Sequence, residues 1–136
     1  MNKLTLLSAL GALMLASPVL AADPAAGEAD FKKCKACHSL TATDGTEVVK
    51  GGKTGPDLGG VIGRPVASVA DLKYGESILA VGASGAVWDE AMLAAYVTDP
   101  TAWLKEKTGD GAAKSKMSFK LAKGAEDMAA YLATIK

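Results

Sequence analysis

The stretch Cys34-Lys35-Ala36-Cys37-His38 constrains this chain more than any other part of its sequence. Two cysteines separated by two residues and followed at once by histidine form the pattern by which a haem is attached covalently to a polypeptide. The thiols of Cys34 and Cys37 then form thioethers with the porphyrin, and His38 becomes the first axial ligand of the iron. His38 is the only histidine in the chain, so an imidazole ligand has no other source.

Two cysteines at this spacing also occur in zinc sites, redox-active dithiols and disulfides. A structural zinc site takes about four ligands, and the chain has no cysteine or histidine beyond Cys34, Cys37 and His38. A thioredoxin-like dithiol follows a buried strand, whereas the residues before Cys34 are polar and helical in character. Haem attachment is therefore the favoured interpretation, and a dithiol or a plain disulfide is the alternative.

Residues 1–21 have the layout of a secretory signal peptide. Lys3 supplies a positive charge, an apolar run extends from Leu4 to Leu15, and Ala21 precedes a change to polar composition. The apolar segment is slightly short for a transmembrane helix, which needs about 20 apolar residues, and Pro18 interrupts it. We expect cleavage after Ala21, with Ala22 as the alternative, and a single secreted domain at 22–136.

The charges of the chain are balanced overall but unevenly distributed. The 15 basic and 15 acidic residues exclude a general attraction to nucleic acid. Residues 74–104 contain four acids and no base, whereas residues 105–123 contain six lysines and two acids. Most of these lysines are expected to be solvated, but the asymmetry indicates an electric dipole that orients the protein toward a partner.

Helix signals begin directly after the predicted signal peptide. Asp23 is an N-cap followed by Pro24 at the first helical position, so a helix is predicted from there into the cysteine pair. Residues 39–63 hold seven glycines and one proline without a long apolar period, which indicates an irregular loop. A loop of this length is unusual in a compact domain unless it packs on a rigid cofactor.

Four further helices are predicted downstream. They cover Tyr74 to Ala80, a segment capped by Asp89 and ended by Asp99-Pro100, Thr101 to Lys107, and Gly124 to Ile135. Apolar stripes mark the second and the last of them: Met92, Leu93, Tyr96 and Val97, and Met128, Tyr131, Leu132 and Ile135. The predicted fold class is therefore all-α, with several short helices and long loops wrapped around one covalently bound haem.

A six-coordinate iron bound by His38 needs a second donor. Met92 and Met128 lie on apolar stripes, where methionine is usually core. Met117 lies in a polar, lysine-rich loop, where a buried thioether has no packing reason, so it is the favoured ligand. The alternatives in the same loop are Lys114, Lys116 and Lys120.

Five separated matches, in order, resemble the class I c-type cytochromes, specifically bacterial cytochrome c2 or c550, over nearly all of 22–136. They are Gly27 and Phe31 before the cysteine motif; Lys53-Thr54-Gly55-Pro56-Asp57-Leu58-Gly59-Gly60-Val61-Ile62-Gly63-Arg64; Trp88, Tyr96 and Pro100; Met117-Ser118-Phe119; and Met128-Ala129-Ala130-Tyr131-Leu132. The chain departs from relatives at Asp57, often asparagine, at Gly59, often aromatic or histidine, and in a longer 107–117 segment.

The resemblance implies roles for residues around the haem. The Pro56 carbonyl accepts a hydrogen bond from His38 and fixes the orientation of its imidazole. Arg64, Tyr74 and Trp88 satisfy or screen the haem propionates, whose charge is costly to bury unpaired.

On the other axial side, the resemblance makes Met117 the second ligand. It places Tyr96 near the Met117 sulfur and Phe119 among the residues that bind the cofactor. It also predicts that Gly27 and Phe31 meet Met128 and Tyr131 where the first and last helices cross. Without the haem motif, the aromatic residues in this set would be interpreted as ordinary core.

The function implied by the resemblance is that of a soluble periplasmic one-electron carrier, not an enzyme. A cytochrome bc1 complex is the expected donor, and a photosynthetic reaction centre or a terminal oxidase the expected acceptor. The monomer is expected to dock transiently on acidic partner surfaces, and to meet the membrane only through its partners. The lysines expected at the docking face are Lys33, Lys53, Lys114, Lys116 and Lys120.

Two rival classes make different predictions. A haem enzyme or gas sensor leaves the sixth iron position open and binds carbon monoxide readily. Cytochromes c′ do so, but they carry the haem motif near the C-terminus, opposite to this chain. A dithiol oxidoreductase contains no haem and is colourless.

Overall fold

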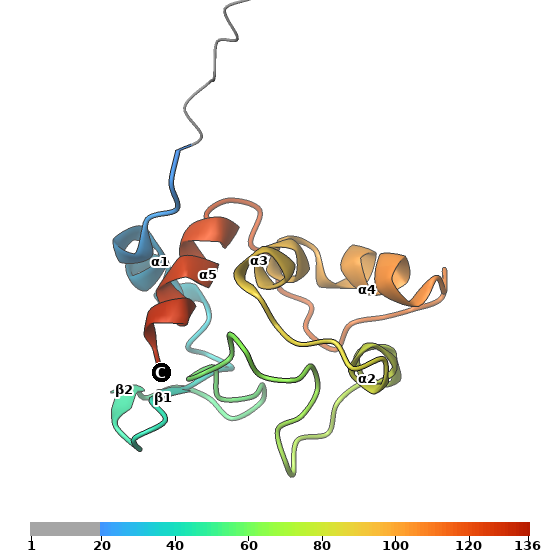
Figure 1. Cartoon of the computed structure of the whole chain (residues 1–136), viewed down its shortest axis with the longest axis horizontal. Helices are drawn as coiled ribbons and strands as arrows, with labels where there is room; N and C mark the ends of the chain where they lie inside the picture. Colours follow the sequence, from blue (N-terminus) through green and yellow to red (C-terminus); the bar gives the residue numbers. More distant parts are fainter. Residues whose placement is uncertain (1–19) are drawn as a thin grey trace, which may run out of the picture.

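A computed structural model describes residues 20–136, so the predicted signal peptide falls almost entirely outside the described residues. In this range the chain forms five α-helices, a 3-10 turn and a two-stranded sheet (Figure 1). The elements are α1 Pro24–Asp30, the 3-10 turn Phe31–Lys33, β1 Leu40–Thr41, β2 Glu47–Val49, α2 Glu76–Ala83, α3 Glu90–Thr98, α4 Pro100–Thr108 and α5 Ala125–Thr134.

Aspartate caps start three of the helices. The carboxylate of Asp23 accepts from the backbone N–H of Ala25 at 2.9 Å and begins α1, with Pro24 at the first helical position. Asp89 begins α3 in the same way, and Asp99 begins α4 by accepting from the N–H of Ala102 at 3.0 Å. Such caps satisfy backbone donors that have no partner inside the helix. The starts predicted from Asp23 and Asp89 are confirmed.

The first and last helices cross at one end of the molecule (Figure 1). Gly27 faces α5 so closely that a Cβ built on it would meet the carbonyl oxygen of Asp127 and lie 2.8 Å from Tyr131 Cβ. The rings of Phe31 and Tyr131 meet edge to face, with centroids 6.1 Å apart. The predicted contact of Gly27 and Phe31 with the last helix is confirmed, through Tyr131 and the Asp127 backbone.

The region 39–63 is mostly irregular, as predicted, but it also contains the antiparallel pair β1 and β2, which the sequence did not indicate. The pair is short, with Leu40 opposite Val49, and a turn in which Asp44 accepts from the N–H of Thr46 joins the strands. Strands of two and three residues are too short to show a period in the sequence.

Helix boundaries differ from the predicted ones by up to three residues. Helix α2 begins at Glu76, and Tyr74 lies before it, with its hydroxyl accepting from the N–H of Val69 at 3.2 Å. Helix α4 includes Pro100 and Thr108, and ends where Gly109 adopts a left-handed conformation with φ of 67°. Proline is compatible with the first turn of a helix, so it extends α4 by one residue.

Three aromatic rings pack together where α3 meets α4. Trp88 stacks on Trp103 with centroids 5.4 Å apart, and Tyr96 contacts both rings. Trp88 and Trp103 are buried. This aromatic cluster of Trp88, Tyr96 and Trp103 joins α3 to α4.

No helix within 20–136 has the length and apolar character needed to cross a bilayer.

Replacing Gly27 with alanine tests the helix crossing. The added methyl group meets backbone, which cannot rotate away, so we expect a loss of about 1–3 kcal/mol in the free energy of unfolding. Denaturant titration should show a lower midpoint. Gly111→Ala is the matched control, because a Cβ there meets nothing within 4 Å. Equal midpoints for the two variants would contradict the close approach.

Candidate functional site

The described residues enclose a cavity of about 840 Å³ whose walls are mainly apolar. Close-packed interiors leave few voids larger than a water molecule, and cavities of this size are typical of ligand sites. Its apolar walls come from loops and from four of the helices and include Leu58, Val61, Ile78, Leu93, Val97, Leu104, Leu121 and Leu132. Every site residue predicted from the sequence lines it: Cys34, Cys37, His38, Pro56, Arg64, Tyr74, Trp88, Tyr96, Met117 and Phe119.

The cysteine pair lies on a helical turn that continues from the 3-10 helix. The N–H of Cys37 donates to the carbonyl of Cys34 at 3.1 Å, and the N–H of His38 donates to the same oxygen at 3.0 Å. The two thiols are not joined as a disulfide. Burial, and then the charge of Asp30, raises the pKa of the Cys34 thiol. A redox-active dithiol needs a lowered thiol pKa, so this environment disfavours the dithiol alternative.

His38 is held in one tautomer by the backbone. Its Nδ1 lies 2.7 Å from the carbonyl oxygen of Pro56, which can only accept, so Nδ1 carries the proton. Burial lowers the pKa of His38, although the bond to Pro56 and the charge of Asp57 oppose the shift. The neutral ring therefore keeps an unprotonated Nε2, which is the atom a metal needs. Gly55 packs on the ring face, where any Cβ would overlap the imidazole.

The segment between α4 and α5 carries Met117 to the cavity. The N–H of Met117 donates to Ser115 Oγ at 3.1 Å, and the hydroxyl of Tyr96 lies 3.4 Å from the same oxygen. The N–H of Leu121 donates to the carbonyl of Val97 at 2.8 Å and ties the far end of the segment to α3. Tyr96 therefore reaches the Met117 segment through Ser115.

The alternative methionines are placed differently from each other. Met128 is buried on α5 and also lines the cavity, whereas Met92 packs at the edge of the core and does not line it. Met128 is thus the remaining methionine rival to Met117.

Arg64, Tyr74 and Trp88 lie along the same cavity. Arg64 donates from Nη2 to the carbonyl oxygen of Asp57 at 2.8 Å, and burial lowers the pKa of its guanidinium from a very high ordinary value. An arginine stays cationic under such a shift, so it places a positive charge beside apolar walls.

Comparison with known proteins gives a consistent result. The chain is 57% identical over 126 residues to cytochrome c2 of Rhodobacter capsulatus, covering 93% of this chain and 92% of that protein. It is 56% identical over 135 residues to cytochrome c-550 of Paracoccus versutus, covering 96% and 88%. The chain belongs to the class I c-type cytochromes of the cytochrome c2 and c-550 type. No family model matches it.

The solved structures agree with this assignment. The X-ray structure of ferric cytochrome c-550 from Paracoccus versutus superposes with a TM-score of 0.81 at 58% identity, covering 84% of this chain and 98% of that one. The structure of cytochrome c2 from Rhodobacter capsulatus gives the same TM-score and identity. The predicted family and fold class are confirmed, with the small sheet as an addition.

The cofactor of this cytochrome is one covalent haem c, and the residues present fit it. Cys34 and Cys37 are positioned as the haem attachment motif requires, at the wall of an apolar cavity. The same wall holds a neutral imidazole with its Nε2 unprotonated. This donor set suits haem iron and lacks the four ligands of a zinc site.

Some residues that matter in this cytochrome were not found from the sequence. Trp103 supports both Trp88 and Tyr96, and Lys73 lines the cavity mouth. Trp103 carried a weak signal, as a large apolar residue in a predicted helix. Lys73 lies in an irregular segment and carried none.

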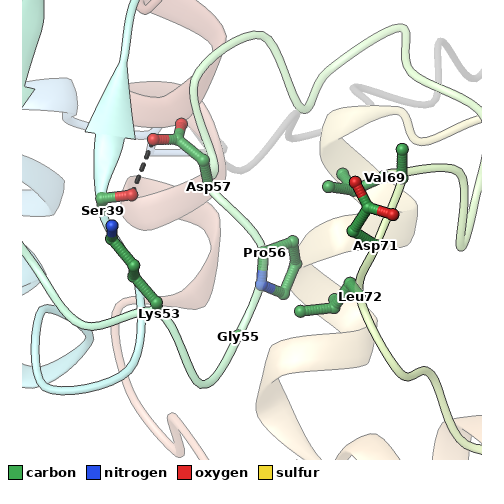
Figure 2. Close-up of a pocket in the computed structure, with 9 residues that line it drawn as sticks. Ser39, Lys53, Gly55, Pro56, Asp57, Val69, Asp71 and Leu72 are labelled. Atoms are coloured by element: carbon green, nitrogen blue, oxygen red, sulfur yellow. Dashed lines mark hydrogen bonds between the residues drawn. The ribbon is translucent and has the colours of Figure 1, made fainter.

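The lysines predicted for docking fall into three groups. Lys33, Lys114 and Lys116 line the cavity, and Lys53 lines an adjoining groove beside Pro56 (Figure 2). Lys33 pairs with Asp30 at 2.8 Å, and Lys120 pairs with Asp99 at 2.7 Å without lining the cavity. The charges of Lys33 and Lys120 are therefore partly compensated.

Asp99→Asn tests the ion pair that holds the Met117 segment to the start of α4. The hydrogen bonds from Lys120 and then from the Ala102 N–H lower the pKa of Asp99. A lowered folded-state pKa gives stability above the unfolded-state pKa, near 4, that is lost as pH falls through the folded value. We expect the variant to unfold at lower denaturant than the parent at pH 7, and the gap to close below about pH 4.

Asp110→Asn is the control for this measurement. It removes an exposed carboxylate that accepts from the Ala112 N–H and lies outside the ion pairs of the described residues. A gap for Asp99→Asn that stays constant from pH 7 to pH 3 would contradict the role of its charge.

Proposed function

We propose that this cytochrome carries single electrons in the periplasm, with His38 and Met117 as the axial ligands of its haem iron. The observation that carries the proposal is the convergence of His38, Met117 and the attachment cysteines, from segments far apart in the chain, on one apolar cavity. Bound haem supplies a one-electron couple between ferric and ferrous iron. The residues of the chain set the reduction potential of that couple and determine which partner proteins can approach it.

Two features support a ligand set that stays unchanged between oxidation states. The bond from His38 Nδ1 to Pro56 fixes the imidazole and strengthens its Nε2 as a donor. The thioether of Met117 is a soft, neutral donor, which favours the ferrous state and raises the reduction potential. Apolar walls such as Leu93 and Leu104 exclude water.

We assign Arg64, Tyr74 and Trp88 to the propionate side and Phe119 to the binding of the haem. The half-buried guanidinium of Arg64 provides the positive charge that carboxylates need in an apolar site. Phe119 lines the cavity while remaining 40% exposed, which places it at the rim.

The physiological partners follow from the family. We propose a cytochrome bc1 complex as donor and a photosynthetic reaction centre or terminal oxidase as acceptor. Lysines at the cavity mouth, Lys73, Lys114 and Lys116, support docking on acidic surfaces. Redox encounters bury less than about 1,200 Å², which permits rapid release. Monomeric state and export through cleavage near Ala21 belong to the same proposal.

Met117→Ala tests the ligation. The parent should show the absorption of a low-spin c-type haem in both oxidation states and the iron–sulfur charge-transfer absorption when oxidised. Removal of the thioether should abolish that band, lower the potential and let the reduced protein bind carbon monoxide readily. Optical spectra and potentiometry measure all three changes.

Met128→Leu is the matched control, because Met128 also lines the cavity. It should keep the charge-transfer band and the potential. The assignment fails if the band survives Met117→Ala or is lost in Met128→Leu. Rapid carbon monoxide binding by the parent would favour the gas-sensor class, and a colourless product the dithiol class.

A pair of double variants tests the docking face. Lys114→Gln with Lys116→Gln removes two charges at the cavity mouth, whereas Lys105→Gln with Lys123→Gln removes two exposed charges that do not line it. Stopped-flow reduction by a bc1 complex at low salt should slow on the order of tenfold for the first pair, and the difference should shrink as salt rises. Equal slowing by both pairs would indicate only an effect of net charge.

A further inference from the structure

The carboxylate of Asp57 accepts four hydrogen bonds. Its Oδ1 accepts from the backbone N–H of Thr41 at 3.0 Å and of Gly59 at 2.8 Å. Its Oδ2 accepts from Ser39 Oγ and Thr41 Oγ1, each at 2.7 Å. Figure 2 shows the bond to Ser39 beside Pro56. A carboxylate offers about four lone-pair sites, so this one has a donor for each.

These donors lie where they affect the histidine directly. Ser39 follows His38, the hydrogen-bond donor, in the chain, and Asp57 follows Pro56, the acceptor. The bond from Ser39 to the Asp57 carboxylate therefore joins the residues that come directly after His38 and Pro56. Two backbone bonds flank this link: Gly55 N–H to the Cys37 carbonyl at 2.8 Å, and Leu58 N–H to the Ser39 carbonyl at 3.0 Å. Backbone bonds thus hold the segment at Gly55 and at Leu58, and the Asp57 carboxylate holds the residues between them.

The backbone of Asp57 is also held from the cavity side. Its carbonyl oxygen accepts from Arg64 Nη2 at 2.8 Å. Asp57 therefore cannot turn without releasing either Arg64 or the four donors on its carboxylate. Pro56 lacks an N–H of its own, so these contacts of its neighbours set the direction of its carbonyl.

We propose that Asp57 is a positioning residue for His38, which keeps the Pro56 carbonyl aligned with Nδ1 and thereby tunes the imidazole as a ligand. The inference rests on the proposed ligation by His38. Charge-assisted hydrogen bonds are roughly twice as strong as neutral ones, so a carboxylate holds this loop better than an amide or hydroxyl would. Although burial raises the pKa of Asp57, the bonds from Ser39, Thr41 and Gly59 outweigh it and leave the pKa below its ordinary value.

Asparagine at position 57 separates geometry from charge. Its amide oxygen still accepts from the two backbone N–H groups, and the hydroxyls of Ser39 and Thr41 can rotate to accept from its NH2 group. Alanine loses both the charge and all four bonds. The difference between Asp57→Ala and Asp57→Asn therefore measures positioning alone.

The experiment uses the haem-loaded protein and the hydrogen-exchange rate of the His38 ring N–H, followed by NMR in the oxidised state. Asp57→Ala should accelerate this exchange on the order of tenfold, because a misaligned Pro56 carbonyl weakens the hydrogen bond that protects the ring N–H, while Asp57→Asn stays close to the parent. The reduction potential should rise further in Asp57→Ala than in Asp57→Asn, because a weaker imidazole donor stabilises ferric iron less. Asp44→Ala, which removes a turn carboxylate in the β1–β2 loop, should change neither the ring exchange nor the charge-transfer band.

The slowly exchanging amides of α5 report a merely structural effect. Equal acceleration of those amides and of the ring N–H in Asp57→Ala would overturn the inference, as would a ring exchange rate equal to the parent's. If Asp57→Ala does not accumulate, Ser39→Ala with Thr41→Val removes the two hydroxyl donors, and an unchanged ring exchange rate then overturns it. A failure of the proposed ligation is distinct, because it removes the charge-transfer band of the parent itself.

Discussion

The hydrogen bond from His38 Nδ1 to the Pro56 carbonyl is the interaction on which the rest of the site depends. It converts a flexible side chain into a donor with one tautomer and one direction. The neighbouring residues are of types that allow it: Gly55 has no Cβ to strike the ring, and Pro56 has no N–H to compete. The conformation of the irregular loop around Pro56 is therefore set by its close packing against the segment that carries His38.

Both helices and loops contribute residues to the wall of the cavity. The crossing of α1 and α5 is packed through the rings of Phe31 and Tyr131, and the aromatic cluster of Trp88, Tyr96 and Trp103 joins α3 to α4. The loops contribute residues such as His38, Pro56 and Met117 to the wall of the 840 Å³ cavity. Haem that fills this cavity stabilises the folded chain, because a group that binds the folded state and not the unfolded state shifts the folding equilibrium toward the folded state.

The features that could be predicted from the sequence are those that depend on residues close together in the chain. The cysteine motif, the caps Asp23 and Asp89 and the stripe on α5 are read within a few residues, and each agrees with the structure. The pairing of β1 with β2, the ion pair of Asp99 with Lys120 and the four donors on Asp57 join residues that are distant or irregular in the chain. No periodicity records such contacts. The family resemblance supplied Pro56, Arg64 and Tyr74, which composition alone would have left as a turn residue, a surface charge and a core aromatic.

The His38 wall and the Met117 wall of the cavity are held by different kinds of contact. The His38 wall is fixed by the bond from His38 to the Pro56 carbonyl, by backbone bonds between the two segments, and by the Asp57 carboxylate with its four donors. The segments that carry His38 and Pro56 are therefore held together. The Met117 wall is fixed by one short backbone bond, from Leu121 to Val97 at 2.8 Å, by longer bonds through Ser115 and by the exposed pair of Lys120 with Asp99. Exposed ion pairs contribute little and are screened by salt, so this wall has the lower local stability. The Met117 side of the cavity is therefore the side that we expect to open first.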